Sequence, residues 1–143
     1  MNDCLTLVFE TSTPHASLAI IEPGGRVELR EVTSDRSHNA VLFTPLKELL
    51  DSRTIRDIGL VLVGSGPGSY SGTRVGIAAA QGVAIASGCP AVAVPSVLAV
   101  PSAMHRAPCL AIGDARRGSF WTAMTNHGSA LAEPELTDLE GLL

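Results

Sequence analysis

Short apolar runs alternate along this chain with glycine, proline and polar turns, and the spacing within each run predicts its structure. Runs of about four to eight residues rich in Val, Ile, Leu and Phe predict strands, whereas apolar residues that recur every three or four positions predict helices. The predicted strands cover residues 5–10, 16–21, 26–32, 58–63 and 91–94. The predicted helices cover about 39–51, 71–87 and 96–104, and a hairpin over 109–114 and 119–125 precedes a further helix that starts at 136.

The order of these elements predicts the fold class. The first three strands follow one another through short turns and form an antiparallel meander, whereas the run 58–63 is typical of a parallel strand buried on both faces. Three meandering strands followed by two helical crossovers is the order of the ribonuclease H-like layer, which builds each half of the actin-like ATPases (the ASKHA fold). We therefore expect an α/β protein with a mixed five-stranded sheet flanked by helices. Residues 1–103 form its first domain, and residues 104–143 begin a second, truncated one.

Composition narrows the possible functions. The 143 residues are 45% hydrophobic but only 3% aromatic, so the core consists of Ala, Val, Leu and Ile. A net charge of −4 argues against a chain that binds nucleic acid by itself. Residues 75–104 carry no charge, but glycines and prolines interrupt them, so we expect no membrane span. Three scattered cysteines indicate no disulfide framework and favour a cytoplasmic protein.

The segment 64–76 contains five glycines directly after an apolar strand, so it forms a strand-to-helix loop. Glycine lets a backbone approach a phosphate closely, and the helix that follows offers free N–H groups to an anion. The same glycines instead allow one helix to pack closely on a neighbour. A P-loop is excluded because that motif needs a lysine, and Lys47 is the only lysine in the chain.

A nucleotide site would have to use this loop and the end of the first strand. Its weak candidates are Glu10, Gly66, Gly68 and Ser69. Kinases and ATPases of this fold place an Asp at the end of strand one, where this chain has the longer Glu. One carboxylate with neither a second acidic ligand nor a phosphate-clamping lysine cannot build a phosphoryl-transfer site. The serine is better explained as a helix cap, and the four histidines lack metal-binding spacing, so we expect no metal and no cofactor.

The predicted helix 71–87 has one face of small residues spaced by four: Gly72, Gly76, Ala80 and Ala84. Together with Leu42 and Phe43 of the preceding helix, this stripe is either core beneath the sheet or a surface on which a partner's helix packs. If the stripe is a partner surface, Ala80→Arg abolishes pairing and leaves the fold intact. If the stripe is core, the same substitution unfolds the protein. Arg74 is the one charge in the first turn of this helix.

Three segments carry the motifs of a known family. They are residues 7–13 (LVFETST), the glycine segment continued through residues 74–82 (RVGIAAAQG), and residues 112–121 (IGDARRGSFW). Residues 37–45, beginning Ser37-His38-Asn39-Ala40, add weaker support at the start of the first helix. The chain resembles the bacterial TsaB (YeaZ) family, partners in the synthesis of threonylcarbamoyladenosine in tRNA. The likeness extends from residue 5 to about 125, which implies a shortened member or a fragment.

The resemblance implies a non-catalytic scaffold. Such a subunit dimerises with the catalytic paralogue TsaD, works alongside the ATPase TsaE, forms a homodimer when alone, and meets tRNA only within the complex. The expected partner interface comprises Leu42, Phe43, Gly72, Arg74, Gly76, Ala80 and Ala84. Arg116 and Arg117 are expected to be solvated charges in a hairpin turn, with contact to tRNA or to a partner as the alternative. Trp121 is expected to anchor a small core. The alternative is a small actin-like nucleotide-binding phosphotransferase or ATPase that uses Glu10 and the glycine loop.

Overall fold

The structure is a computed structural model that describes residues 4–33, 42–104 and 107–142. It divides into two compact units. Unit 1 comprises Met1–Ser65 and Ser69–Val94, and unit 2 comprises Gly66–Gly68 and Pro95–Leu143.

The division after Val94 differs from the expected domain boundary at residue 103. Its physical reason is a pair of hydrogen bonds between Ser96 and Gly66. The Gly66 N–H donates to Ser96 Oγ over 3.0 Å, and the Ser96 N–H donates to the Gly66 carbonyl over 2.8 Å. Residues from Pro95 onward, together with the middle of the glycine loop, therefore belong to unit 2.

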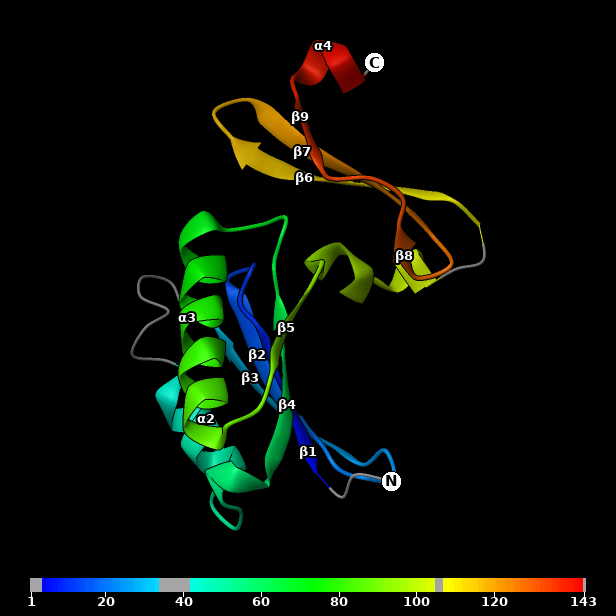
Figure 1. Ribbon diagram of the computed structural model, residues 1–143. Helices are drawn as coiled ribbons and strands as arrows, with labels where there is room; N and C mark the ends of the chain where they lie inside the picture. Colours follow the sequence, from blue (N-terminus) through cyan, green and yellow to red (C-terminus); the bar gives the residue numbers. More distant parts are fainter. Residues whose placement is uncertain (1–3, 34–41, 105–106, 143) are drawn as a thin grey trace. The chain divides into compact units, whose positions relative to one another are not determined.

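Unit 1 is built on a five-stranded mixed sheet in the order β3-β2-β1-β4-β5 (Figure 1). The first three strands pair antiparallel, β4 is parallel to β1, and β5 is parallel to β4. The bounds are β1 Leu5–Glu10, β2 His15–Ile21, β3 Val27–Thr33, β4 Ile58–Gly64 and β5 Ala91–Val94. Each end lies within one residue of the prediction, and the predicted mixed five-stranded sheet is confirmed.

Helices cover one side of this sheet: α2 (Phe43–Leu49) and α3 (Tyr70–Ser87) lie on the same side in Figure 1. A short 3-10 turn, η1 (Ile55–Asp57), precedes β4. The core lies between these layers because every second strand residue points to the helices. Fully buried examples are Leu7, Phe9, Leu18, Ile20 and Val61. Residues 34–41 lie outside the described residues, so the expected helix start near Ser37 and His38 does too.

Unit 2 is a four-stranded sheet with short helical turns before and after it. Its elements are η2 Ser96–Ala99, η3 Pro101–Met104, β6 Cys109–Arg116, β7 Ser119–Asn126, β8 Ser129–Ala130, β9 Glu135–Thr137 and α4 Leu139–Leu142. The predicted hairpin is β6–β7. Trp121 is half-buried in it and stacks over Gly113, where a Cβ would overlap the indole ring.

Of the two helices predicted in unit 2, one is wrong and the other begins later than predicted. The expected helix over 96–104 is two 3-10 turns, because Val100 precedes Pro101 and is extended (φ −71°, ψ 128°), as a residue before proline prefers. The helix expected from residue 136 begins only at Leu139. Glu135–Thr137 instead forms β9 and pairs with β7, so a tertiary contact overrides the local pattern. No helix among the described residues is long and apolar enough to cross a membrane.

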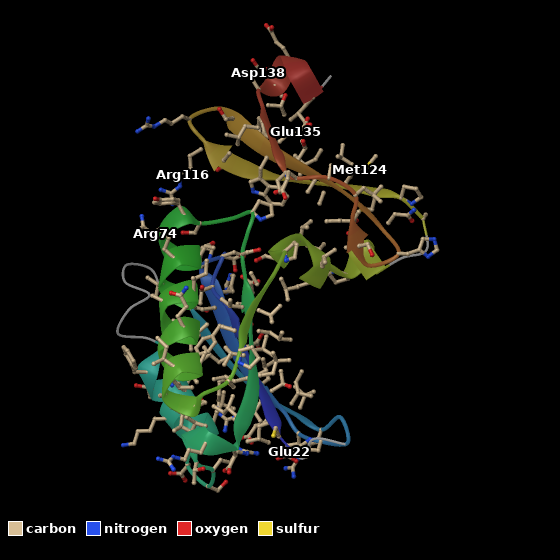
Figure 2. The ribbon with its side chains drawn as sticks, viewed as in Figure 1. Glu22, Arg74, Arg116, Met124, Glu135 and Asp138 are labelled. Carbon is tan, nitrogen blue, oxygen red and sulfur yellow. The ribbon has the colours of Figure 1, made fainter. Side chains whose placement is uncertain are left out.

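An ion-pair cluster joins β3 to the segments beside it. Arg53 Nη2 lies 2.7 Å from Glu22 Oε1 and 3.0 Å from Glu28 Oε2, and Arg30 Nη2 lies 2.8 Å from Glu28 Oε1. Figure 2 labels Glu22, one member of this group. The hydrogen bond from Arg53, with that from Arg30, holds the pKa of Glu28 below its ordinary value of 4.5.

We expect Glu28→Gln to lower the melting temperature only where Glu28 is ionised. Because the folded-state pKa is depressed, its stabilisation is fully present above pH 4.5 and is lost as the pH falls through the folded-state pKa. Thermal melts of the wild type and Glu28→Gln from pH 7 to pH 3 should therefore converge at the acid end. Glu31→Gln, an exposed position on the same strand, is the control; a gap for Glu28→Gln that does not change with pH would contradict this prediction.

Candidate functional site

The loop after β1 is tied to the beginning of α3. Thr11 is fully buried, and its hydroxyl donates to the Gly72 carbonyl over 2.8 Å. The Ser69 N–H donates to the Ser12 carbonyl over 2.6 Å. At Gly76, one turn further along α3, an added Cβ would overlap the Thr11 hydroxyl oxygen. The glycines at these two helix positions therefore bring the helix close to the β1–β2 loop, which is the close-packing interpretation of the glycine segment.

Glu10 and Ser69 both hold backbone groups of this loop. The Glu10 carboxylate accepts a 2.7 Å hydrogen bond from the Ser12 N–H, two residues on. Ser69 is the N-cap of α3, and its hydroxyl accepts from the Gly72 N–H over 3.3 Å. The cap predicted for Ser69 is present. These two side chains can stabilise the loop in any state of the protein, with or without a ligand.

The other two nucleotide candidates, Gly66 and Gly68, belong to unit 2. Gly66 already donates its N–H to Ser96, which leaves that donor unavailable to a phosphate. Gly68 is exposed. Within the described residues, no group of three or more His, Cys, Asp or Glu side chains lies close enough together to hold a metal ion.

The small-residue stripe of α3 packs inside unit 1. Gly72, Gly76, Ala80 and Ala84 are all buried, with Ala80 at 0% exposure. They lie in the same core as β1 and β4, against which α3 makes its contacts. Leu42 is also buried, at 3% exposure. The core alternative is therefore correct for these residues, and their expected role as partner contacts is wrong, because no partner can reach them.

Other positions of α2 and α3 present large side chains to solvent. Phe43 of α2 is 69% exposed, and Tyr70 and Ile85 of α3 are 76% and 83% exposed. Arg74 lies between the last two along the helix and is exposed as well (Figure 2). We call these four residues the outer helical face. Of the expected interface, Phe43 and Arg74 are accessible to a partner.

Arg74 orders the aromatic ring beside it. Its guanidinium carbon lies 5.2 Å from the centroid of the Tyr70 ring, and its Nη1 donates to the Tyr70 hydroxyl over 2.7 Å. A cation that stacks on a ring one turn away restrains both side chains before any partner binds. The exposed pair therefore has less conformational entropy to lose on association.

Sequence reasoning missed Tyr70 and Ile85. The signal that could have found them is the helical period: once 72, 76, 80 and 84 are assigned to the core, positions 70, 74, 78 and 85 fall on the other side of α3. The expected partner interface placed these small residues on the surface, although core packing is the alternative for the same pattern. In this helix they are the side that packs.

The β6–β7 turn carries a second exposed group. Arg116 and Arg117 have positive φ of 69° and 55°, and both are exposed, as expected for solvated turn charges (Figure 2 labels Arg116). The Asp114 carboxylate accepts from the Arg116 N–H over 2.6 Å and stabilises this turn.

Comparison with known proteins identifies the family to which these features belong. Residues 31–141 match the family model described as TsaD, tRNA N6-adenosine threonylcarbamoyltransferase. The chain is also 29% identical over 112 residues to the tRNA threonylcarbamoyladenosine biosynthesis protein TsaB of Haemophilus influenzae, covering 75% of this chain and 47% of that one. The chain belongs to the TsaB (YeaZ) family.

Two further relatives extend this result. An uncharacterized protein of Mycobacterium tuberculosis is 35% identical over 121 residues, which cover 82% of this chain and 57% of the relative. The structure of YeaZ from Pseudomonas aeruginosa matches with a TM-score of 0.82 at 24% identity, over 94% of this chain and 68% of that chain. This likeness shows that the chain has the fold of that YeaZ structure, in agreement with the predicted α/β class and mixed five-stranded sheet. The chain spans about half the length of the curated relatives that it matches.

Proposed function

We propose that this chain acts as a non-catalytic docking subunit in the synthesis of threonylcarbamoyladenosine in tRNA. Its relatives of the TsaB family are named for that biosynthesis, and the family model that it matches is named for the transferase itself. The proposed partner is a TsaD-like catalytic paralogue in the cytoplasm, with a TsaE-like ATPase in the same assembly. Because the net charge is −4, tRNA contact is proposed only within that complex.

The observation that carries this proposal is the outer helical face. Three large apolar or aromatic side chains more than two-thirds exposed on one helical layer are what a protein interface needs at its centre. Aromatic residues and arginine supply most of the binding energy at such centres, and here Tyr70 and Arg74 are already ordered against each other.

The hydrogen bonds that Glu10 and Gly66 make within the protein favour a docking role over a catalytic one. The Gly66 N–H is donated to Ser96 and is not free to bind a phosphate, and one oxygen of the Glu10 carboxylate accepts from the Ser12 N–H. A phosphotransferase needs positioned charge at the transferred group. The phosphotransferase alternative predicts that the chain alone binds ATP with magnesium and loses that binding in Glu10→Ala.

We expect Tyr70→Ala to weaken binding to the TsaD-like protein of the same organism. Removing an ordered aromatic anchor costs about 2 kcal/mol, or roughly a 30-fold rise in Kd. Isothermal titration calorimetry measures the change, and Phe43→Ala tests α2 in the same way. Leu29→Ala is the matched control, because Leu29 is 50% exposed but lies on β3.

Three results would count against the docking proposal. The first is no complex with the wild-type chain, and the second is an equal loss of affinity in Leu29→Ala. The third is magnesium-dependent ATP binding by the chain alone that disappears in Glu10→Ala. Circular dichroism of each variant separates lost contacts from lost folding.

A further inference from the structure

The β6–β7 hairpin closes through a turn in which three successive residues have positive φ. The values are 69° at Arg116, 55° at Arg117 and 76° at Gly118. Arg116 pairs with Ser119, so Arg117 and Gly118 are the two central residues, and positive φ at both is typical of a type I′ turn. The register shifts between Asp114 and Arg116, which places Arg116 at a bulge.

Arginine is an unfavourable residue at both of these positions. Glycine, asparagine and aspartate adopt positive φ most readily, and Asn-Gly is a preferred pair for a type I′ turn. An arginine at positive φ is strained, because its Cβ approaches the following carbonyl oxygen. The turn is held by the Asp114 carboxylate, which accepts from the Arg116 N–H over 2.6 Å, and by Gly118. The two arginines therefore lower the stability of the hairpin, and turn formation does not account for them.

The next hairpin has a turn of the same kind with a residue better suited to it. Between β7 and β8, His127 has a φ of 52° and Gly128 a φ of 72°, and Asn126 pairs with Ser129. Histidine is among the residues enriched at positive φ, and arginine is not. The β7–β8 turn is therefore an internal reference for a positive-φ residue without a guanidinium group.

Both guanidinium groups of the β6–β7 turn are available to a ligand. Arg116 and Arg117 are exposed, and neither side chain forms an ion pair with another described residue, whereas Arg53 is held in the cluster of unit 1. They are the only Lys or Arg residues in the described part of unit 2. The acidic residues of that part are spread over several elements: Asp114, Glu133, Glu135, Asp138 and Glu140. Positive charge in unit 2 is thus concentrated at one turn.

We propose that the Arg116–Arg117 turn binds the phosphate backbone of tRNA within the complex with the TsaD-like protein. This inference rests on the proposed function, since a relative is named for a tRNA modification and the net charge of −4 disfavours RNA binding by the chain alone. A guanidinium stays charged at physiological pH and donates two parallel hydrogen bonds to a phosphate. An acidic peptide offers similar chemistry, but the biosynthesis named for the relatives supplies RNA as the polyanion.

The strained turn suits this role because it orders the two arginines before RNA binds. A two-residue loop between paired strands has little backbone freedom, so the cost of positive φ is met during folding and not during association. Contacts to phosphate position an RNA without reading its bases. The turn would therefore hold the tRNA backbone, and recognition of the base would be left to the partner.

Asparagine substitution separates the charge of the arginines from their strain. The double variant Arg116→Asn with Arg117→Asn removes both charges and introduces a residue that tolerates positive φ. We expect its unit 2 to melt a few degrees above the wild type, followed by the fluorescence of Trp121, the only tryptophan, which lies in β7. The double variant Arg116→Lys with Arg117→Lys keeps the charges and the strain, so it should melt close to the wild type.

Binding to RNA is measured on the complex of this chain with the TsaD-like protein, by fluorescence anisotropy of a labelled, unmodified substrate tRNA transcript. The asparagine double variant should raise Kd about tenfold or more, equally for a tRNA that is not a substrate. The slope of log Kd against log salt concentration should fall by about 1.4–1.8, as expected for two lost phosphate contacts. The lysine double variant should keep most of the affinity and the slope. His127→Asn, at the reference turn, should bind like the wild type.

Several results would overturn this inference and leave docking intact. One is an unchanged tRNA affinity and salt slope for the asparagine double variant in a complex that forms normally. Another is a lysine double variant as weak as the asparagine one, because charge is then not what binds. Weaker calorimetric binding of the asparagine variant to the TsaD-like protein without tRNA would make the turn a protein contact. If the wild-type chain forms no complex at all, the docking proposal fails, and this inference fails with it.

Discussion

Ala80→Arg is expected to unfold unit 1. Ala80 is 0% exposed on the face of α3 that packs against the sheet, in the same core as Leu7, Phe9 and Val61. A guanidinium placed there loses its hydration and finds no described acidic partner in that core. The expected loss exceeds about 4 kcal/mol, which is comparable to the whole stability of a domain of this size.

Ala78→Arg is the matched control, two residues away on the same helix but exposed to solvent. It should keep a native circular dichroism spectrum and a urea midpoint close to that of the wild type, because a surface substitution in a helix changes stability by roughly 0.5 kcal/mol or less. A folded Ala80→Arg would show that the stripe is not the core. The expectation that this substitution abolishes pairing in an intact fold is replaced by the unfolding prediction.

Gly76→Ala should destabilise unit 1, although alanine is the better helix former. The added Cβ would overlap the Thr11 hydroxyl oxygen, so either α3 moves away or Thr11 rotates and loses its hydrogen bond to Gly72. A buried hydroxyl without a partner costs about 1–3 kcal/mol, which outweighs the gain of roughly 1 kcal/mol in helix propensity. We expect a net loss of up to about 2 kcal/mol in urea unfolding.

Gly82→Ala separates the gain in helix propensity from the cost of the lost hydrogen bond. Nothing lies within 4 Å of a Cβ at this exposed position of the same helix, so only the propensity gain applies. This variant should be more stable than the wild type by about 0.5–1 kcal/mol. A stabilised Gly76→Ala would contradict the close contact between α3 and the β1–β2 loop.

The strands were predictable because their signal is local. Alternation in β1 and β2 correctly indicates one buried face for each strand. The continuous apolar run of β4 predicts burial on both faces, but Leu60 and Leu62 are only half-buried. The helix predicted over 96–104 failed for the opposite reason: alanine and valine fit both a helix and a pair of 3-10 turns, and Pro101 decided between them. In the same way β9 depends on pairing with β7, which its own sequence does not encode.

The site was harder to predict than the fold. Periodicity located a face of small residues on α3, but an exposed docking face and a closely packed core face both use small residues. The hydrogen bond between Thr11 and Gly72 shows that this face is packed in the core, and these two residues lie 61 positions apart in the sequence. The hydrogen bond of Gly66 is also long-range, because its N–H donates to the Ser96 hydroxyl, 30 residues further along the chain.

The sequence by itself determined the α/β class, the order of the five strands, the glycine loop before α3 and the resemblance to the TsaB family, because hydrophobic period and motif spacing are properties of the chain. Only the tertiary structure decided which face of α3 is buried, and Tyr70 and Ile85 are exposed as a consequence. It also decided which strands form the edges of the sheet. These features depend on contacts between residues far apart in sequence, and no local pattern records the partner of such a contact.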